Sequence, residues 1–181
     1  MNSGNTNVGH KYRHVLAVVL AVTGWGSWPM MVRAQAPDAR FAAVIEAARA
    51  HPGCLGIDTG QTRSGRQVIF AWFENKAALV SWYKSEAHQR AMKIAFPNRT
   101  FNREPLPDTP DDSGQILAIV SLKLSDAPPR EGMGLPIGSI GIELYTPVPG
   151  GVAVGGRFSP QSVRVPALRE FELPPSSGPS R

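Results

Sequence analysis

The spacing of hydrophobic positions from residue 38 onward predicts an alternation of helices and strands. Phe41, Val44 and Ile45 begin a helical apolar stripe, Asp38 is a suitable N-cap, and Pro52-Gly53 ends the segment. Residues 54–59 and 67–73 are short apolar runs on either side of a polar turn. The sequence therefore predicts a helix followed by a β-hairpin.

The run 67–73 is apolar on both faces. Alternate residues of a strand point to opposite sides of a sheet, which gives two sets here: Val68, Phe70, Trp72 and Ile69, Ala71, Phe73. Residues 115–124 have the same character, and helices with one apolar stripe can cover only one face. We therefore predict a homodimer joined through its sheets. The alternative cover is the chain's own segment 139–158, through Ile140, Ile142 and Leu144.

A second helical region follows the hairpin. Asn75 is a predicted N-cap for a helix that carries Leu79, Trp82 and Tyr83, and Ser85 can begin a further helix that ends before Pro97. Residues 97–114 are rich in proline and acidic residues and predict a long surface connection.

The C-terminal part predicts a β-rich extension over residues 126–173. Within it, residues 139–146 and 151–158 flank a proline- and glycine-containing turn at 147–150, a pattern typical of a hairpin. Residues 174–181 are mostly serine, glycine and proline and are predicted to be disordered.

Residues 1–36 have the order of a secretory signal peptide. Lys11 and Arg13 precede a largely apolar run, and Ala34-Gln35-Ala36 has the small residues that a signal peptidase requires. Glycines and a proline interrupt the run, so a transmembrane anchor is the less favoured alternative. We predict cleavage after Ala36, export to the periplasm or the outside, and no stable membrane anchor after cleavage.

Charge and cysteine content exclude several classes of protein. Cleavage would remove three basic residues and no acidic one, so the net charge would fall from +5 to +2. No basic cluster interleaved with aromatic residues remains, which argues against a nucleic-acid partner. Cys54 is the only cysteine, so no internal disulfide can form, and we interpret it as a small buried hydrophobe.

The stretch 50–92 resembles the antibiotic biosynthesis monooxygenase (ABM) family. The resemblance is carried by PGCLGIDTG after the first helix, QVIFAWFENKAAL for the next strand and helix start, and WYKSEAHQRAMK for the helix end. It implies an α+β, ferredoxin-like unit over residues 37–125 whose sheets pair into a dimeric α+β barrel. Such units begin with a strand before the first helix, so either the C-terminal hairpin supplies a substitute strand or residues 28–35 are that strand. We favour the substitute.

The resemblance also suggests candidate chemistry. The family includes cofactor-independent oxygenases, which bind an electron-rich substrate, remove a proton and stabilise the resulting anion. The side chains that could share these roles are His88, Glu74 and Arg90, and those that could line an aromatic pocket are Phe70, Trp72, Trp82 and Tyr83. The simpler reading is that His88 forms a local hydrogen bond and that the aromatic residues are core.

We therefore predict an exported ABM-like protein that binds a small molecule, either as a cofactor-independent monooxygenase on a small aromatic compound or as a non-catalytic binding or structural protein. No cofactor and no metal are predicted. Haem is the minor alternative, because some haem-degrading relatives place an iron ligand where His88 stands. The second residue that those relatives use, an asparagine, lies on the missing first strand.

Overall fold

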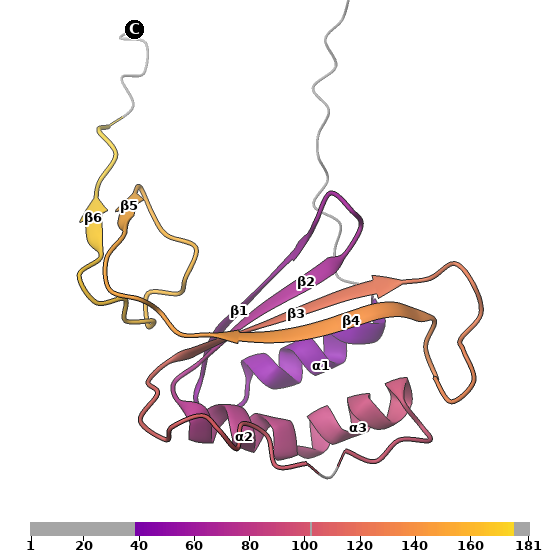
Figure 1. Cartoon of the computed structure of the whole chain (residues 1–181). Helices are drawn as coiled ribbons and strands as arrows, with labels where there is room; N and C mark the ends of the chain where they lie inside the picture. Colours follow the sequence, from indigo (N-terminus) through magenta and orange to yellow (C-terminus); the bar gives the residue numbers. More distant parts are fainter. Residues whose placement is uncertain (1–38, 102, 176–181) are drawn as a thin grey trace, which may run out of the picture. The chain divides into compact units, whose positions relative to one another are not determined.

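The computed structural model describes residues 39–101 and 103–175, so the predicted cap Asp38 and the signal segment 1–36 lie outside the described residues. The helices are α1 (Ala39–Arg49), α2 (Lys76–Lys84) and α3 (Glu86–Ala95). The strands are β1 (Cys54–Gln61), β2 (Gln67–Phe73), β3 (Ile116–Leu124), β4 (Ile137–Tyr145), β5 (Val152–Val154) and β6 (Arg169–Phe171). These elements confirm the α+β class (Figure 1).

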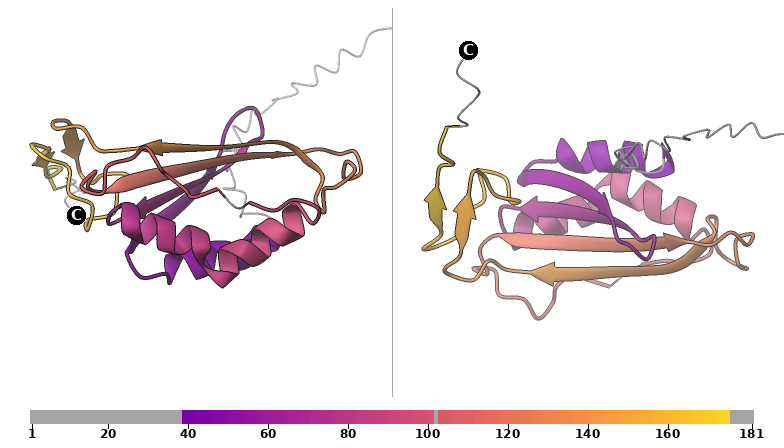
Figure 2. Two further views of the ribbon diagram at one scale, coloured as in Figure 1. Left: turned by 60° about the horizontal axis from the view of Figure 1, so that its bottom comes forward. Right: turned by 90° about the horizontal axis from the view of Figure 1, so that it is seen from above.

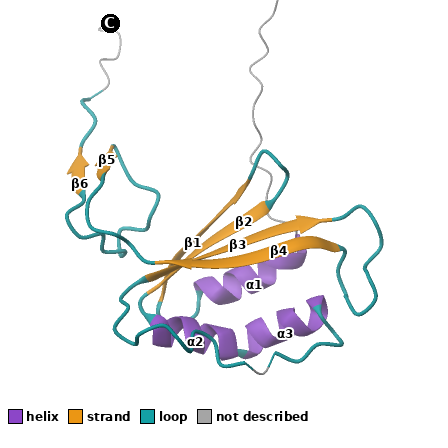
Figure 3. Ribbon diagram, viewed as in Figure 1, coloured by secondary structure: helices purple, strands orange, loops and turns teal. Residues whose placement is uncertain are grey.

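The first four strands form one antiparallel sheet in the order β1-β2-β3-β4. The three helices lie on one side of this sheet, and β4 forms its outer edge (Figure 3). Strand β2 has β1 on one side and β3 on the other. In the pairing with β3, Phe70 lies opposite Ile119 and Ala71 lies opposite Ala118. Both positions next to β2 are therefore filled by strands of the described residues, so a strand from residues 28–35 is not required beside β2.

The predicted hairpin of 139–146 with 151–158 is wrong. Residues 137–145 pair with β3 in the main sheet, and only Val152–Val154 of the second segment form a strand, which pairs in parallel with β6. The glycines around this short strand have φ angles between +69° and +139°, a conformation that interrupts extended structure: Gly150, Gly151, Gly155 and Gly156. Hence β4 extends the sheet beyond residue 125.

The helix-facing side of the sheet holds the main core. Ala71 and Phe73 of β2 pack with Ile45 and Ala48 of α1, and Phe73 is almost completely buried. The predicted helix starts are confirmed, because the Asn75 side chain accepts a hydrogen bond from the Ala78 N–H (2.9 Å) and Ser85 accepts one from the His88 N–H (3.3 Å).

The opposite face of the sheet is covered in part by the C-terminal segment 146–175. Phe158 packs edge-to-face on Phe70 and Trp72, at centroid distances of 4.8 and 5.0 Å. Pro160 occupies the space where a side chain at Gly56 would lie. The chain's own extension thus supplies a cover, while the predicted homodimer through the sheets remains a prediction.

The predicted cover by the side chains of β4 is wrong for the face of the sheet that lies away from the helices. Ile140, Ile142 and Leu144 pair in register with Leu122, Val120 and Ala118, and all six line the helix-facing side. The two further views in Figure 2 show the extension at one end of the sheet, beyond the end of β4. The cover therefore comes from residues later in the chain than 139–146.

We expect Phe158→Ala to lower the free energy of unfolding by about 1–2 kcal/mol, because it removes two edge-to-face contacts and exposes the indole of Trp72. Trp72 is only 3% exposed, whereas Phe158 is itself 57% exposed, so the loss should be smaller than for a fully buried phenylalanine. Urea unfolding followed by circular dichroism measures the change.

The matched control is Phe171→Ala on β6, since Phe171 is 54% exposed and pairs with Val154 at a distance from β2 in the fold. We expect this change to alter stability by less than about 0.5 kcal/mol. Equal losses for the two variants would contradict the assigned role of Phe158.

Candidate functional site

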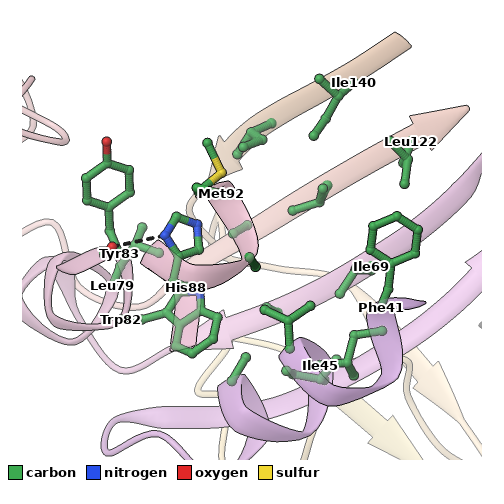
Figure 4. A pocket seen from close by; sticks show the side chains of 18 of the residues that line it. Phe41, Ile45, Ile69, Leu79, Trp82, Tyr83, His88, Met92, Leu122 and Ile140 are labelled. Carbon is green, nitrogen blue, oxygen red and sulfur yellow. Dashed lines mark hydrogen bonds between the residues drawn. The ribbon is translucent and has the colours of Figure 1, made fainter. Parts of the chain in front are cut away.

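A cavity of about 400 Å³ lies between the helices and the sheet. Its walls come from α1, α2, α3, the four strands of the main sheet and the loop that contains Pro105 and Leu106. Figure 4 shows Phe41 and Ile45 on one side of the space and Trp82, Tyr83 and His88 on the other. The apolar row of β4 completes the wall at the outer edge of the sheet.

The cavity is almost entirely apolar. Among the described residues that line it, none is Lys, Arg, Asp or Glu, and the polar side chains are Thr59, Gln67, Trp82, Tyr83 and His88. An ionised group would lose its hydration here without gaining a partner of opposite charge. The site is therefore suited to a ligand that is uncharged and hydrophobic over most of its surface.

The break between α2 and α3 places His88 at this wall. The chain leaves α2 after Lys84, and Ser85 caps the next helix. The carbonyl of Tyr83 lies in the last turn of α2, where carbonyls lack partners within the helix. It accepts hydrogen bonds from Nδ1 of His88 (3.0 Å) and Nε2 of Gln89 (2.6 Å). A carbonyl only accepts, so Nδ1 carries the proton and Nε2 is the free acceptor.

His88 is neutral at neutral pH. Burial lowers the pKa of His88 below its ordinary value, and the hydrogen bond to the Tyr83 carbonyl only opposes this in part. The ring also packs against Trp82 and Tyr83, at centroid distances of 5.5 and 5.2 Å. In Figure 4 the ring nitrogen that does not bind Tyr83 points away from that carbonyl, toward the interior of the cavity.

Two of the predicted catalytic residues do not reach the cavity. Glu74 is exposed at the end of β2, where its main-chain N–H donates to the Gly53 carbonyl. Arg90 forms an ion pair with Glu86, and its side chain is 68% exposed. Residues 88 and 90 are two positions apart on α3, so their side chains point to different sides of the helix. The predicted grouping of His88 with Glu74 and Arg90 is thereby corrected.

The predicted aromatic pocket is also divided. Trp82 and Tyr83 line the cavity, whereas Phe70 and Trp72 lie on the opposite face of the sheet against Phe158. The alternation of β2 decides this, since Ile69, Ala71 and Phe73 occupy the helix-facing positions. Of the four aromatic residues predicted to line a pocket, the structure thus places two in the cavity, Trp82 and Tyr83.

Sequence reasoning missed Met92, Leu106 and the apolar row of β4 as cavity residues. Two signals were available. His88, Met92 and Ala95 follow each other at helical spacing, and Ile140, Ile142 and Leu144 alternate along a strand. No local pattern indicates that Leu106 enters the cavity.

Comparison with known proteins gives one family. Residues 33–94 match the family model of antibiotic biosynthesis monooxygenases. The chain carries an ABM domain. No curated protein and no solved structure matches the chain. The match spans α1, β1, β2, α2 and nearly all of α3, so β3, β4 and the extension lie beyond it. The ABM domain places the chain among monooxygenase-like or small-molecule-binding proteins.

The cavity between the helices and the sheet does not fit haem. The orientation of His88 would suit an iron ligand, because a ligating histidine commonly donates its other N–H to a backbone carbonyl. However, no lysine or arginine of the described lining could pair with the carboxylates of haem. Among residues 39–101 and 103–175, no group of three or more His, Cys, Asp or Glu side chains could hold a metal ion either.

We expect the Nδ1–H tautomer of His88 in the folded protein, and protonation at a lower pH than in the urea-unfolded chain. The reason is that the Tyr83 carbonyl fixes the tautomer and burial lowers the pKa. Between the folded and unfolded pKa values only the unfolded chain binds the proton, so acidification through that window lowers the free energy of unfolding. Nitrogen-15 NMR of the imidazole over a pH series measures both properties. An Nε2–H tautomer would contradict the first expectation, and a raised pKa in the folded state would contradict the second.

Haem titration provides a separate test of the cavity. We expect the Soret band to be the same with wild type and with His88→Ala, because the apolar lining has no partner for the haem carboxylates. A shift of the band in wild type that His88→Ala abolishes would show His88 ligation and overturn this conclusion.

Proposed function

We propose that the ABM domain binds a small hydrophobic aromatic molecule with one hydrogen-bond donor, and that it acts on this molecule as a cofactor-independent monooxygenase. The observation that carries the proposal is the neutral His88, whose free Nε2 is a hydrogen-bond acceptor in an otherwise apolar cavity. A phenolic hydroxyl group would supply the donor, and the surrounding apolar side chains would contact the rings.

In this proposal His88 is the general base. Nε2 takes a proton from the bound substrate, and the Tyr83 carbonyl then stabilises the imidazolium through the existing Nδ1–H bond. The substrate anion and the imidazolium together carry no net charge, which limits the cost of forming them in an apolar site. Where the hydroxyl group is the enol form of a ring ketone with a conjugated CH₂ group, removal of its proton gives an anion that reduces O₂ and forms a C–O bond at that carbon, which keeps one hydrogen. The peroxide regains the proton and loses water, so one oxygen atom ends in a carbonyl group and the other in water.

A non-catalytic binding function is the second candidate. The observation that favours it is that the described lining has no charged residue near His88 to stabilise an anion. The same cavity would then hold an uncharged ligand through one hydrogen bond and apolar contacts, without turnover. Oxygen consumption in the presence of a ligand that binds separates the two functions.

We also propose that the protein is exported, on the basis of the signal-like residues 1–36. The pairing of β2 supports this, because β1 and β3 already occupy the positions on its two sides. Within residues 39–101 and 103–175, no helix is long and apolar enough to cross a membrane. Cell fractionation and N-terminal sequencing of the secreted form test the proposal.

We expect wild type to bind 1-naphthol more tightly than naphthalene by about 2–10-fold, because only the naphthol can donate to Nε2 of His88. His88→Leu should remove this preference and leave naphthalene binding nearly unchanged. Quenching of tryptophan fluorescence measures both affinities, since Trp82 lines the cavity. The preference should also fall on acidification below the lowered pKa of His88, when Nε2 becomes protonated.

Arg90→Leu is the matched control, because Arg90 lies on the same helix but pairs with Glu86 at the surface. It should retain the preference of wild type. An unchanged preference in His88→Leu would sink the assigned role of His88. If neither compound binds to wild type, the proposed class of ligand is wrong.

A further inference from the structure

The loop between α3 and β3 sends one leucine into the cavity. Leu106 packs against the core cluster that contains Leu79, Ile116 and Ala118, and it lines the cavity together with Pro105. The loop passes along α2 on its way to β3 (Figure 1). Leu106 therefore closes the end of the cavity that lies next to α2.

The backbone of Leu106 is in an unfavourable conformation. Its φ angle is +58°, in the left-handed region that residues other than glycine and asparagine rarely occupy. The next residue is Pro107, and a residue before proline strongly prefers an extended backbone. Such a conformation persists only where the surrounding structure holds it in place.

Two lysines of α2 hold the loop on either side of Leu106. Nζ of Lys84 lies 2.9 Å from a carboxylate oxygen of Glu104, before Leu106. Nζ of Lys76, which is largely buried, donates to the Thr109 carbonyl (2.6 Å) and to Asp111 (2.9 Å), after Leu106. These contacts keep the loop against α2, so the leucine side chain stays in the cavity despite its backbone.

We propose that Leu106 determines ligand specificity, by setting the length of the group that the cavity accepts toward α2. The inference rests on the proposed function and adds a substrate class to it: a hydroxylated aromatic ring at His88 with an apolar substituent that extends toward Leu106. The opposite end of the cavity is closed by a separate cluster that includes Ala95, Leu122 and Ile137. A substitution of Leu106 thus changes the length of the cavity only at the end next to α2.

The test uses a homologous series of para-alkylphenols, from ethyl to octyl, with binding followed by tryptophan fluorescence. In Leu106→Ala we expect the best-bound phenol to be longer than in wild type by about two or three methylene groups, since three side-chain carbon atoms are removed. The affinity of the longer phenols should rise by about tenfold or more, because each buried methylene group contributes about a fourfold gain. Leu106→Phe should shift the optimum to a shorter chain.

Leu135→Ala is the matched control. Leu135 is also a partly buried loop leucine, but it packs against the opposite cluster and does not line the cavity. It should leave the optimum unchanged. A shared optimum in wild type, Leu106→Ala and Leu106→Phe would overturn the role of Leu106 while leaving the proposed function in place. If wild type binds no member of the series, the proposed function itself fails, and the inference with it.

Leu106→Gly tests the backbone conformation separately. Glycine adopts a φ of +58° without a steric penalty, whereas alanine does not. We therefore expect Leu106→Gly to unfold at a higher urea concentration than Leu106→Ala, although glycine normally destabilises a folded chain relative to alanine. The reverse order would show that the leucine is not held in a strained conformation, and would contradict the role assigned to the two lysines in holding the loop.

Discussion

Strand β2 is apolar on both faces, and the rest of the described structure depends on how each face is covered. One face receives α1, α2 and α3 and forms the core, with Phe73 at its most buried point. The other face holds Trp72, which would lie open to water without the contact from Phe158. Because an exposed apolar sheet face is unfavourable, the C-terminal segment is part of the folded domain rather than an independent appendage.

The break in the helix after Lys84 connects this architecture to chemistry. A continuous helix would pair the Tyr83 carbonyl with its own backbone, whereas the break at Ser85 leaves this carbonyl free to accept from His88. One hydrogen bond therefore sets the tautomer of the imidazole and leaves Nε2 free on the cavity side. Burial keeps the ring neutral, so the acceptor is present at physiological pH.

The residues that match the ABM model supply only part of the cavity lining. The matched residues 33–94 contribute the helices and His88, while β3, β4 and Leu106 come from the part beyond the match. The features that decide which molecule fits thus include segments outside the shared family region. A family assignment alone therefore gives the type of domain but not the size of its ligand.

The sequence by itself determined the elements and several of their boundaries. The caps Asn75 and Ser85, the strand 67–73 and the two-sided character of that strand follow from local chemistry and periodicity. These signals depend on neighbouring residues, so they can be read without knowing the rest of the fold. The resemblance to the ABM family likewise came from a contiguous stretch.

Only the tertiary structure decided which face of each strand meets the cavity and which segments pair. Periodicity shows that Phe70 and Trp72 share a face, but not that this face is the one away from the helices. The partner of residues 137–145 was mistaken because a turn signal at 147–150 is local, whereas pairing with β3 is a long-range contact. Leu106 was missed for the same reason, because lysines about 20 to 30 residues earlier in the chain hold its loop against α2.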